Sequence, residues 1–140
     1  MTFQINASEP RSQTLWPRHC VQESDGAEFH PDLFVPSDAI VVKKGTDPDV
    51  DSYSAFWDNS KLKCTPLEAL LRDAGIDTVY VCGIATDVCV NFTAVDALDH
   101  GFQVYVIEDA CRGVDEAAIN KTLEEIRSKG GKVISSGDIL

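Results

Sequence analysis

Apolar and polar positions alternate along the chain with two different periods from residue 39 onward. Apolar runs rich in β-branched residues predict strands at 39–45, 78–84, 102–109 and 132–140. Between them, apolar positions spaced three and four residues apart predict helices at 64–75, 87–100 and 115–131. Strands that alternate with helices at this pace predict an α/β fold, a three-layer αβα sandwich around a parallel sheet.

The segment before this alternation has a different character. The first 37 residues contain four of the six prolines of the chain and sustain neither period, which predicts mostly loop with short turns. The run at 78–84, in contrast, is apolar without interruption, which is typical of a strand buried on both faces. We expect one domain over residues 1–140.

Composition and charge narrow the class of partner. The formal net charge of -11 opposes binding to nucleic acid, so a small molecule is the expected ligand. No apolar stretch is long enough for a membrane span, and the first residues lack the pattern of a signal peptide, which predicts no membrane contact and a cytoplasmic location. An odd number of cysteines without any C-x-x-C pair argues against a disulfide framework and fits a reducing compartment; they are Cys20, Cys64, Cys82, Cys89 and Cys111.

Cys89 is the strongest candidate for a reactive residue. It follows the predicted strand 78–84 and stands near the start of the next helix, at the edge of the sheet where parallel α/β folds bind ligands. The positive end of a helix dipole favours a thiolate, and free N–H groups there can stabilise an oxyanion. Cys89 is therefore a candidate nucleophile, whereas Cys82, in mid-strand, is expected to be a structural thiol.

Further candidates have weaker signals. Lys43 and Lys44 end the predicted strand 39–45, so an ammonium is expected at the same edge of the sheet as Cys89. His19 is a lone histidine, for which packing or solvation competes with metal binding. A last set consists of aromatic residues in loop-like stretches, which could line a pocket for a flat ring or cover the edge of the core: Trp16, Tyr53, Phe56 and Trp57.

Three motifs in this order carry a family resemblance. The stretches "WPRHCV", "VVKKGTDPDVDSYSAF" and "GIATDVCV" resemble the nicotinamidase and pyrazinamidase branch of the isochorismatase-like cysteine hydrolases, from about Trp16 to the C-terminus. The resemblance implies an isochorismatase-like, Rossmann-like sheet. It also implies hydrolysis of nicotinamide to nicotinate and ammonia through a cysteine thioester, a reaction of NAD salvage.

The resemblance also implies roles for single residues. Cys89 is similar to the nucleophile of the family and Lys44 to its catalytic lysine. His19 is similar to a ligand of a divalent metal, zinc first and iron or manganese as alternatives. The residues implied in substrate binding are Trp16 and Tyr53, which pack on the ring, and Ala85, whose N–H joins that of Cys89 in the oxyanion hole after a cis Ile84–Ala85 peptide bond.

Part of the family pattern has no counterpart in this sequence. The family begins with a strand that bears the aspartate proton acceptor, followed by a strand that leads to an Asp-x-His metal motif, and neither precedes Trp16. The resemblance therefore implies a sheet without its N-terminal strands, with unpaired apolar edges. A homo-oligomer, or another chain that supplies the strands, is then an expected partner.

Two other functions compete with the nicotinamidase hypothesis. One is a catalytically inactive remnant that serves as a binding or regulatory module. The other is a related cysteine amidase for another small amide, such as a ureido or carbamoyl compound.

Overall fold

The computed structural model describes residues 2–3, 11–12 and 14–139, and the chain divides into two compact units, Met1–Ala39 and Ile40–Leu140. In the first unit, β1 (Thr2–Phe3) pairs antiparallel with β2 (Arg11–Ser12), and a short 3-10 helix spans Asp25–Ala27. The rest of its described part is turn and loop, as predicted for the first 37 residues; positions 1, 4–10 and 13 of that prediction lie outside the described residues. A single domain over 1–140 stays a prediction.

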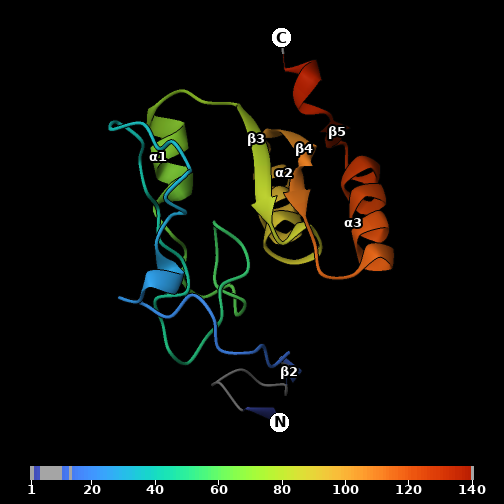
Figure 1. The fold of residues 1–140 in the computed structure, drawn as a ribbon. Coiled ribbons are helices and arrows are strands. Elements are labelled where there is room, and N and C mark those ends of the chain that lie inside the picture. Colours follow the sequence, from blue (N-terminus) through green and yellow to red (C-terminus); the bar gives the residue numbers. More distant parts are fainter. Residues whose placement is uncertain (1, 4–10, 13, 140) are drawn as a thin grey trace. The chain divides into compact units, whose positions relative to one another are not determined.

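A parallel sheet organises the second unit, and it confirms the predicted α/β class. Its strands are β3 (Thr78–Ile84), β4 (Gln103–Arg112) and β5 (Lys132–Ile134), in the order β3-β4-β5 (Figure 1). The register pairs Thr78 with Gln103 and Tyr105 with Lys132, so the carboxyl ends of the strands meet at one edge. The order follows the chain, as expected when each crossover helix adds the next strand on the same side.

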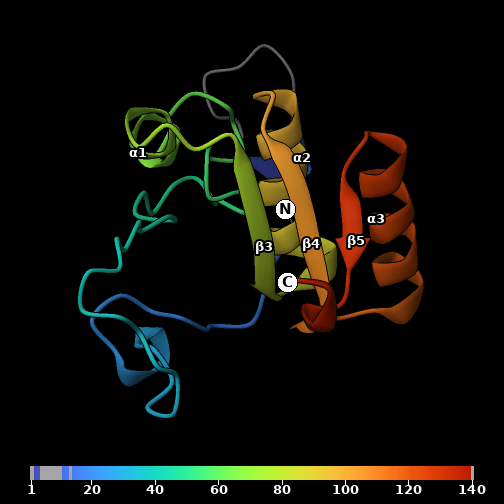
Figure 2. The same ribbon diagram turned by 90° about the horizontal axis from the view of Figure 1, so that it is seen from above.

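Two crossover helices cover one face of this sheet. α2 (Asn91–Asp99) packs behind β3 and β4, and α3 (Glu116–Ser128) packs beside β5 and against α2 (Figure 2). Their buried side chains meet those of β4 in a common core, which contains Ala94, Ala97, Val104, Val106, Leu123 and Ile126. The short helix α1 (Leu67–Asp73), which precedes β3, adds Leu67 and Leu71 to the edge of that core. None of the helices in the described ranges is both long and apolar enough to cross a membrane.

The opposite face of β3 corrects one expectation. We expected burial on both faces, but Tyr80, Cys82 and Ile84 are exposed, and Ile84 retains 80% of its accessible surface. Tyr80 stacks on Tyr105 of β4 with ring centroids 4.9 Å apart, which covers the two rings only partly. The apolar sequence of β3 therefore has more surface to bury than the described part of the chain covers. Cys82 is consequently an accessible thiol, contrary to the structural role expected for it.

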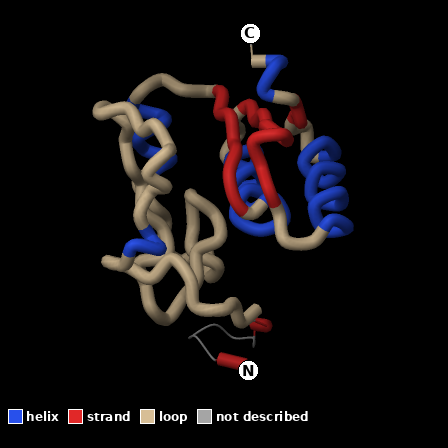
Figure 3. Tube along the Cα trace, viewed as in Figure 1, coloured by secondary structure: helices blue, strands red, loops and turns tan. Residues whose placement is uncertain are grey.

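The predicted strand at 39–45 is wrong. These residues form no strand, and Figure 3 draws the segment from 40 to the start of α1 as loop. Ile40 and Val41 are 72% and 53% exposed. β-branched residues favour the extended backbone, but a strand is stable only when its N–H and C=O groups pair with a neighbour. Within the described ranges no strand pairs with this segment, and β3 is likewise an edge strand.

The free edge of β3 predicts self-association of the purified chain. We expect Ile84→Lys to lower the aggregated fraction, because a charged residue on an exposed strand opposes edge-to-edge pairing. Light scattering across a concentration series measures this fraction. Val114→Lys is the matched control, since Val114 is 66% exposed but lies between β4 and α3. Equal effects of both substitutions would show that net charge, and not the β3 edge, governs association.

Candidate functional site

Cys89 lies in a helical turn directly after the carboxyl end of β3. The turn is a five-residue π-helix, η2 (Thr86–Val90), which continues into α2 and confirms the helix predicted at 87–100. The Ala85 carbonyl accepts hydrogen bonds from the N–H groups of both Val88 (3.1 Å) and Val90 (3.0 Å). The peptide bond before Ala85 is cis, as the resemblance implied. Such widened turns are frequent at functional sites, and this one leaves Cys89 half-buried.

Lys44 meets Cys89 across 45 residues of sequence. Its Nζ donates a hydrogen bond of 2.7 Å to the Ser52 carbonyl and lies 3.4 Å from Cys89 Sγ. An ammonium at this distance stabilises negative charge on the sulfur and holds a proton that can be transferred. The structure therefore brings together two of the residues that the sequence selects, although their catalytic roles stay proposals.

The loop that carries Ser52 is fixed by its own polar contacts. The Tyr53 N–H donates to Asn59 Oδ1 (2.9 Å), and the Asn59 N–H donates to the Asp51 carbonyl (2.7 Å). The Tyr53 ring packs edge-on against Phe92 of α2, with centroids 5.3 Å apart. The Tyr53 ring thus contacts α2 at Phe92, which follows Cys89 by three residues in the sequence.

Two other aromatic candidates cover the core, as the alternative interpretation held. Phe56 is 2% exposed, and its ring stacks on that of His100. The Trp57 Nε1–H donates to His100 Nε2 (2.9 Å), while Nδ1 of the same imidazole lies 2.9 Å from a carboxylate oxygen of Glu68. These contacts join the loop, the end of α2 and α1 into one packed cluster rather than a binding pocket.

Asp87 anchors η2 to the loop between β4 and α3. Its two carboxylate oxygens accept hydrogen bonds from the N–H groups of Val114 and Asp115, each 3.0 Å long. Burial raises the pKa of Asp87, but these hydrogen bonds outweigh it and hold the pKa below its usual value. Gly113 allows the close approach, because a Cβ there would lie 2.5 Å from Ile119 and 2.7 Å from Asp87. The sequence pattern did not single out Asp87, although an acidic residue in the first turn of a helix is a signal.

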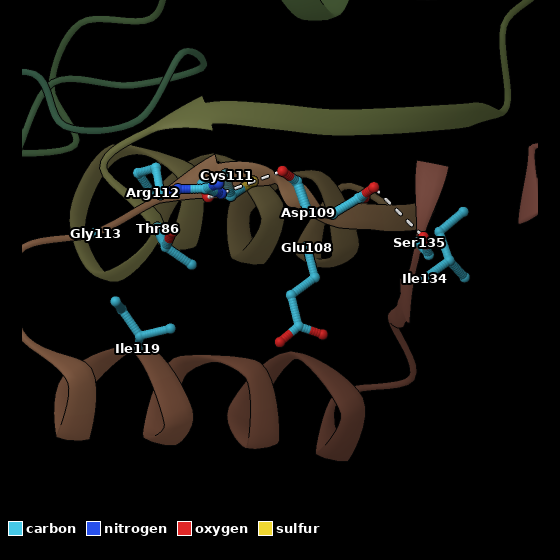
Figure 4. Close-up of a pocket in the computed structure, with 9 residues that line it drawn as sticks. All are labelled: Thr86, Glu108, Asp109, Cys111, Arg112, Gly113, Ile119, Ile134 and Ser135. Atoms are coloured by element: carbon cyan, nitrogen blue, oxygen red, sulfur yellow. Dashed lines mark hydrogen bonds between the residues drawn. The ribbon is translucent and has the colours of Figure 1, made fainter. Parts of the chain in front are cut away.

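A pocket of about 510 Å³ opens between the carboxyl ends of β4 and β5 and α3 (Figure 4). Its one thiol is that of Cys111, whose pKa is raised by burial, so the unreactive thiol form is favoured. The Asp109 carboxylate already accepts hydrogen bonds from the N–H and the hydroxyl of Ser136. The full lining is Thr86, Glu108, Asp109, Cys111, Arg112, Gly113, Ile119, Ile134 and Ser135. None of the site residues expected from the sequence is among them.

Trp16 and His19 lie in the first unit, so their implied roles remain predictions. His19 Nδ1 donates a hydrogen bond of 2.6 Å to the Pro17 carbonyl, which can only accept, so Nε2 is the nitrogen left for a metal. A metal site needs about three such donors. The described ranges contain no group of three or more His, Cys, Asp or Glu side chains that could hold a metal ion, so His19 alone does not make a site.

Comparisons of sequence place the chain among known hydrolases. A model of the isochorismatase domain matches residues 3–138. The nicotinamidase of Acinetobacter baylyi is 44% identical over 129 residues, which cover 91% of this chain and 60% of that protein. The nicotinamidase of Escherichia coli is 54% identical over 103 residues, or 74% of this chain and 48% of that protein. The chain thus spans about half the length of the curated relatives it matches.

Solved structures agree with this placement. An Acinetobacter baumanii nicotinamidase and pyrazinamidase is 43% identical with a TM-score of 0.90, over 100% of this chain and 67% of that one. PnC1 from L. infantum, in complex with nicotinate, is 41% identical with a TM-score of 0.84 (88% and 62% covered). The Pyrococcus horikoshii pyrazinamidase in complex with zinc is 43% identical with a TM-score of 0.76 (86% and 63% covered). The isochorismatase-like fold is therefore established.

Asp87→Asn tests the anchor of η2. We expect a loss of about 1 kcal/mol in the free energy of unfolding at pH 7. The asparagine side chain keeps one oxygen that accepts a hydrogen bond, but its NH2 group faces the second backbone N–H and cannot accept from it. Urea denaturation of both proteins measures the difference.

The same pair of proteins tests the lowered pKa of Asp87. A carboxylate with a lowered folded pKa stabilises the fold above its unfolded value of about 3.8, and this contribution is lost as the pH falls through the lower folded value. The stability difference between the proteins is thus constant above about pH 5 and shrinks below 3.8. A difference that grows on acidification would contradict the assignment.

Lys44→Met tests the contact with the sulfur. We expect alkylation of Cys89 by iodoacetamide at pH 7 to slow at least about fivefold, because a unit charge pair at about 4 Å is worth on the order of 1 kcal/mol even in water. Peptide mass spectrometry follows each cysteine separately, with exposed Cys82 as the internal control. An unchanged rate at Cys89 would show that Lys44 does not activate it.

Proposed function

Because this chain belongs to the isochorismatase family, we propose that it acts as a nicotinamidase-type amide hydrolase, which converts nicotinamide into nicotinate and ammonia. The observation that carries the proposal is the 3.4 Å contact between Lys44 Nζ and Cys89 Sγ at the carboxyl edge of the sheet. The nicotinamidases at 44% and 54% identity support the substrate, as does the nicotinate bound to the L. infantum protein. The reaction belongs to NAD salvage, and we propose the cytoplasm as its compartment.

The proposed mechanism is covalent. The Cys89 thiolate attacks the carboxamide carbon, and the backbone N–H groups of Ala85 and Cys89 stabilise the oxyanion of the tetrahedral intermediate. As the C–N bond breaks, the Lys44 ammonium gives its proton to the leaving nitrogen, which departs as ammonia. Water then attacks the thioester, and Lys44 takes one of its two protons as the Cys89 thiolate leaves. The second proton passes from the new carboxylic acid to solvent, and nicotinate is released.

Aromatic side chains are proposed to bind the substrate ring. Tyr53 is supported by its place against Phe92, on the helix that Cys89 precedes. Trp16 is proposed as a further ring-packing residue, because the family resemblance implies this role and its side chain is partly exposed. Stacking of this kind prefers a flat aromatic amide over an aliphatic one.

A divalent metal is a further proposal, with zinc before iron or manganese. It is supported by the zinc complex of the pyrazinamidase from P. horikoshii and by His19, whose Nδ1 bonds to the Pro17 carbonyl and leaves Nε2 for a metal. Bound beside the substrate, such an ion would supply Lewis-acid polarisation. Since His19 has no second and third ligand in the described ranges, the steps above rely on protein groups alone.

In the described ranges one edge of β3 has no neighbouring strand, which supports a proposal about partners. A strand added to this edge would pair the backbone N–H and C=O groups of β3 that point away from β4. We propose that a second polypeptide segment pairs there, either from another chain or from a second copy of this one. In such a complex, the added segment can also supply the aspartate that the family pattern places before the motif with Trp16.

An inactive binding or regulatory module is the second candidate. The observation in its favour is the lack of a three-donor metal cluster in the part of the chain that the structure describes. Such a module would bind the pyridine ring without releasing ammonia.

Two measurements on the full chain separate these functions. The first is ammonia release from nicotinamide, which we expect to be slow and to vanish in Cys89→Ala while Cys82→Ala retains it. The second is binding of pyridine-3-carbaldehyde, whose carbonyl carbon adds a thiolate reversibly. Binding that is lost in Cys89→Ala supports the nucleophile even where turnover is slow.

The outcomes are distinct. Ammonia release that survives Cys89→Ala removes Cys89 from the mechanism. Aldehyde binding that is independent of Cys89, with no ammonia from any amide, favours the regulatory module. Faster release from a ureido or carbamoyl compound than from nicotinamide indicates the other cysteine amidase.

A further inference from the structure

Thr93 makes a contact that the mechanism above does not use. Its Oγ1 accepts a hydrogen bond of 3.0 Å from the N–H of Ala55, which lies 38 residues earlier in the sequence. Both residues are half-buried, so an N–H deprived of this acceptor would be poorly solvated. The contact therefore fixes the backbone of the loop at Ala55 on the side of α2.

The loop is held to α2 over a short stretch that ends at Ser52. Only two residues separate Ser52 from Ala55, and they leave little slack because each residue spans at most about 3.6 Å. The first of them, Tyr53, packs its ring on Phe92. The second, Ser54, is 2% exposed. A displacement at Ala55 consequently moves the Ser52 carbonyl.

Ser52 in turn orients the lysine. Its carbonyl accepts the 2.7 Å hydrogen bond from Lys44 Nζ, which reaches Cys89 Sγ at 3.4 Å. Cys89 and Thr93 are four residues apart on one continuous helical run, so they lie about one turn from each other. Thr93 is thus linked to Cys89 by a series of contacts through Ala55, Ser52 and Lys44.

From this series of contacts we propose that Thr93 is a positioning residue, which sets the distance between the Lys44 ammonium and the Cys89 sulfur through the Ser52 carbonyl. The inference deepens the proposed function and rests on its assignment of Cys89 as the nucleophile. Thr93 touches neither substrate nor sulfur in this role.

The same loop has a second anchor, which allows the role of Thr93 to be separated from folding. Lys61 Nζ contacts both carboxylate oxygens of Asp96, at 2.5 and 2.7 Å, one turn beyond Thr93 near the end of α2. With this ion pair and the buried Phe56 in place, the loop stays on α2 when the Thr93 hydroxyl is removed. A change at Thr93 should then alter a short distance and leave the fold intact.

The test uses Thr93→Val, which keeps the shape of the side chain and removes the acceptor, and Thr93→Ser, which keeps the acceptor. Alkylation by iodoacetamide at pH 7 is followed at each cysteine by peptide mass spectrometry. We expect Thr93→Val to slow Cys89 at least about threefold with Cys82 unchanged, and Thr93→Ser to restore the rate. In a Lys44→Met background, Thr93→Val should have no further effect, because its influence passes through Lys44.

Each outcome has a definite reading. Equal Cys89 rates in Thr93→Val and the unsubstituted chain overturn the proposal, as does a loss that is just as large in the Lys44→Met background. If Thr93→Val unfolds, Thr93→Ala leaves room for a water at the Ala55 N–H and must show the same loss. The readout needs no turnover: a chain that releases no ammonia but shows the Thr93 effect refutes the proposed reaction and retains the positioning role.

Discussion

Burial of α2 against β4 is the interaction on which the other parts of the second unit depend. Ala94 and Ala97 are fully buried, and their small side chains let the helix lie close to Val104 and Val106. This packing fixes the axis of α2, and with it η2 and Cys89 at one end of the helix. Cys89 is thus placed by apolar contacts that lie away from its sulfur.

Polar contacts then arrange other segments around the fixed helix. Asp87 ties η2 to the loop before α3, while Thr93 and Asp96 tie down the loop that carries Ser52. The carbonyl of Ser52 in this loop accepts a hydrogen bond from Lys44 Nζ, which lies 3.4 Å from Cys89 Sγ. The contact between Lys44 and Cys89 therefore depends on both the sheet-and-helix core and a loop with little regular structure.

The sequence was sufficient where local pattern and tertiary environment agree. The strands β3 and β4 and the helices α2 and α3 have strong periodicity and form a common core. Lys44 does lie beside Cys89, but it is carried by a loop and not by the strand from which its position was predicted. The sequence was insufficient where the outcome depends on a partner: residues 39–45 have the composition of a strand but no neighbour with which to pair, and β3 has apolar residues on a face that stays open. Thr93 and Asp87 escaped notice because their partners lie 38 and 27 residues away.

Rapid acid quench of the full chain during reaction with nicotinamide shows whether Cys89 attacks the carboxamide carbon. Peptide mass spectrometry of the quenched protein is predicted to show a nicotinoyl thioester on the peptide that contains Cys89 and on no other cysteine. Ammonia release without an acyl group on Cys89, or with the acyl group on Cys82 or Cys64, would contradict the account.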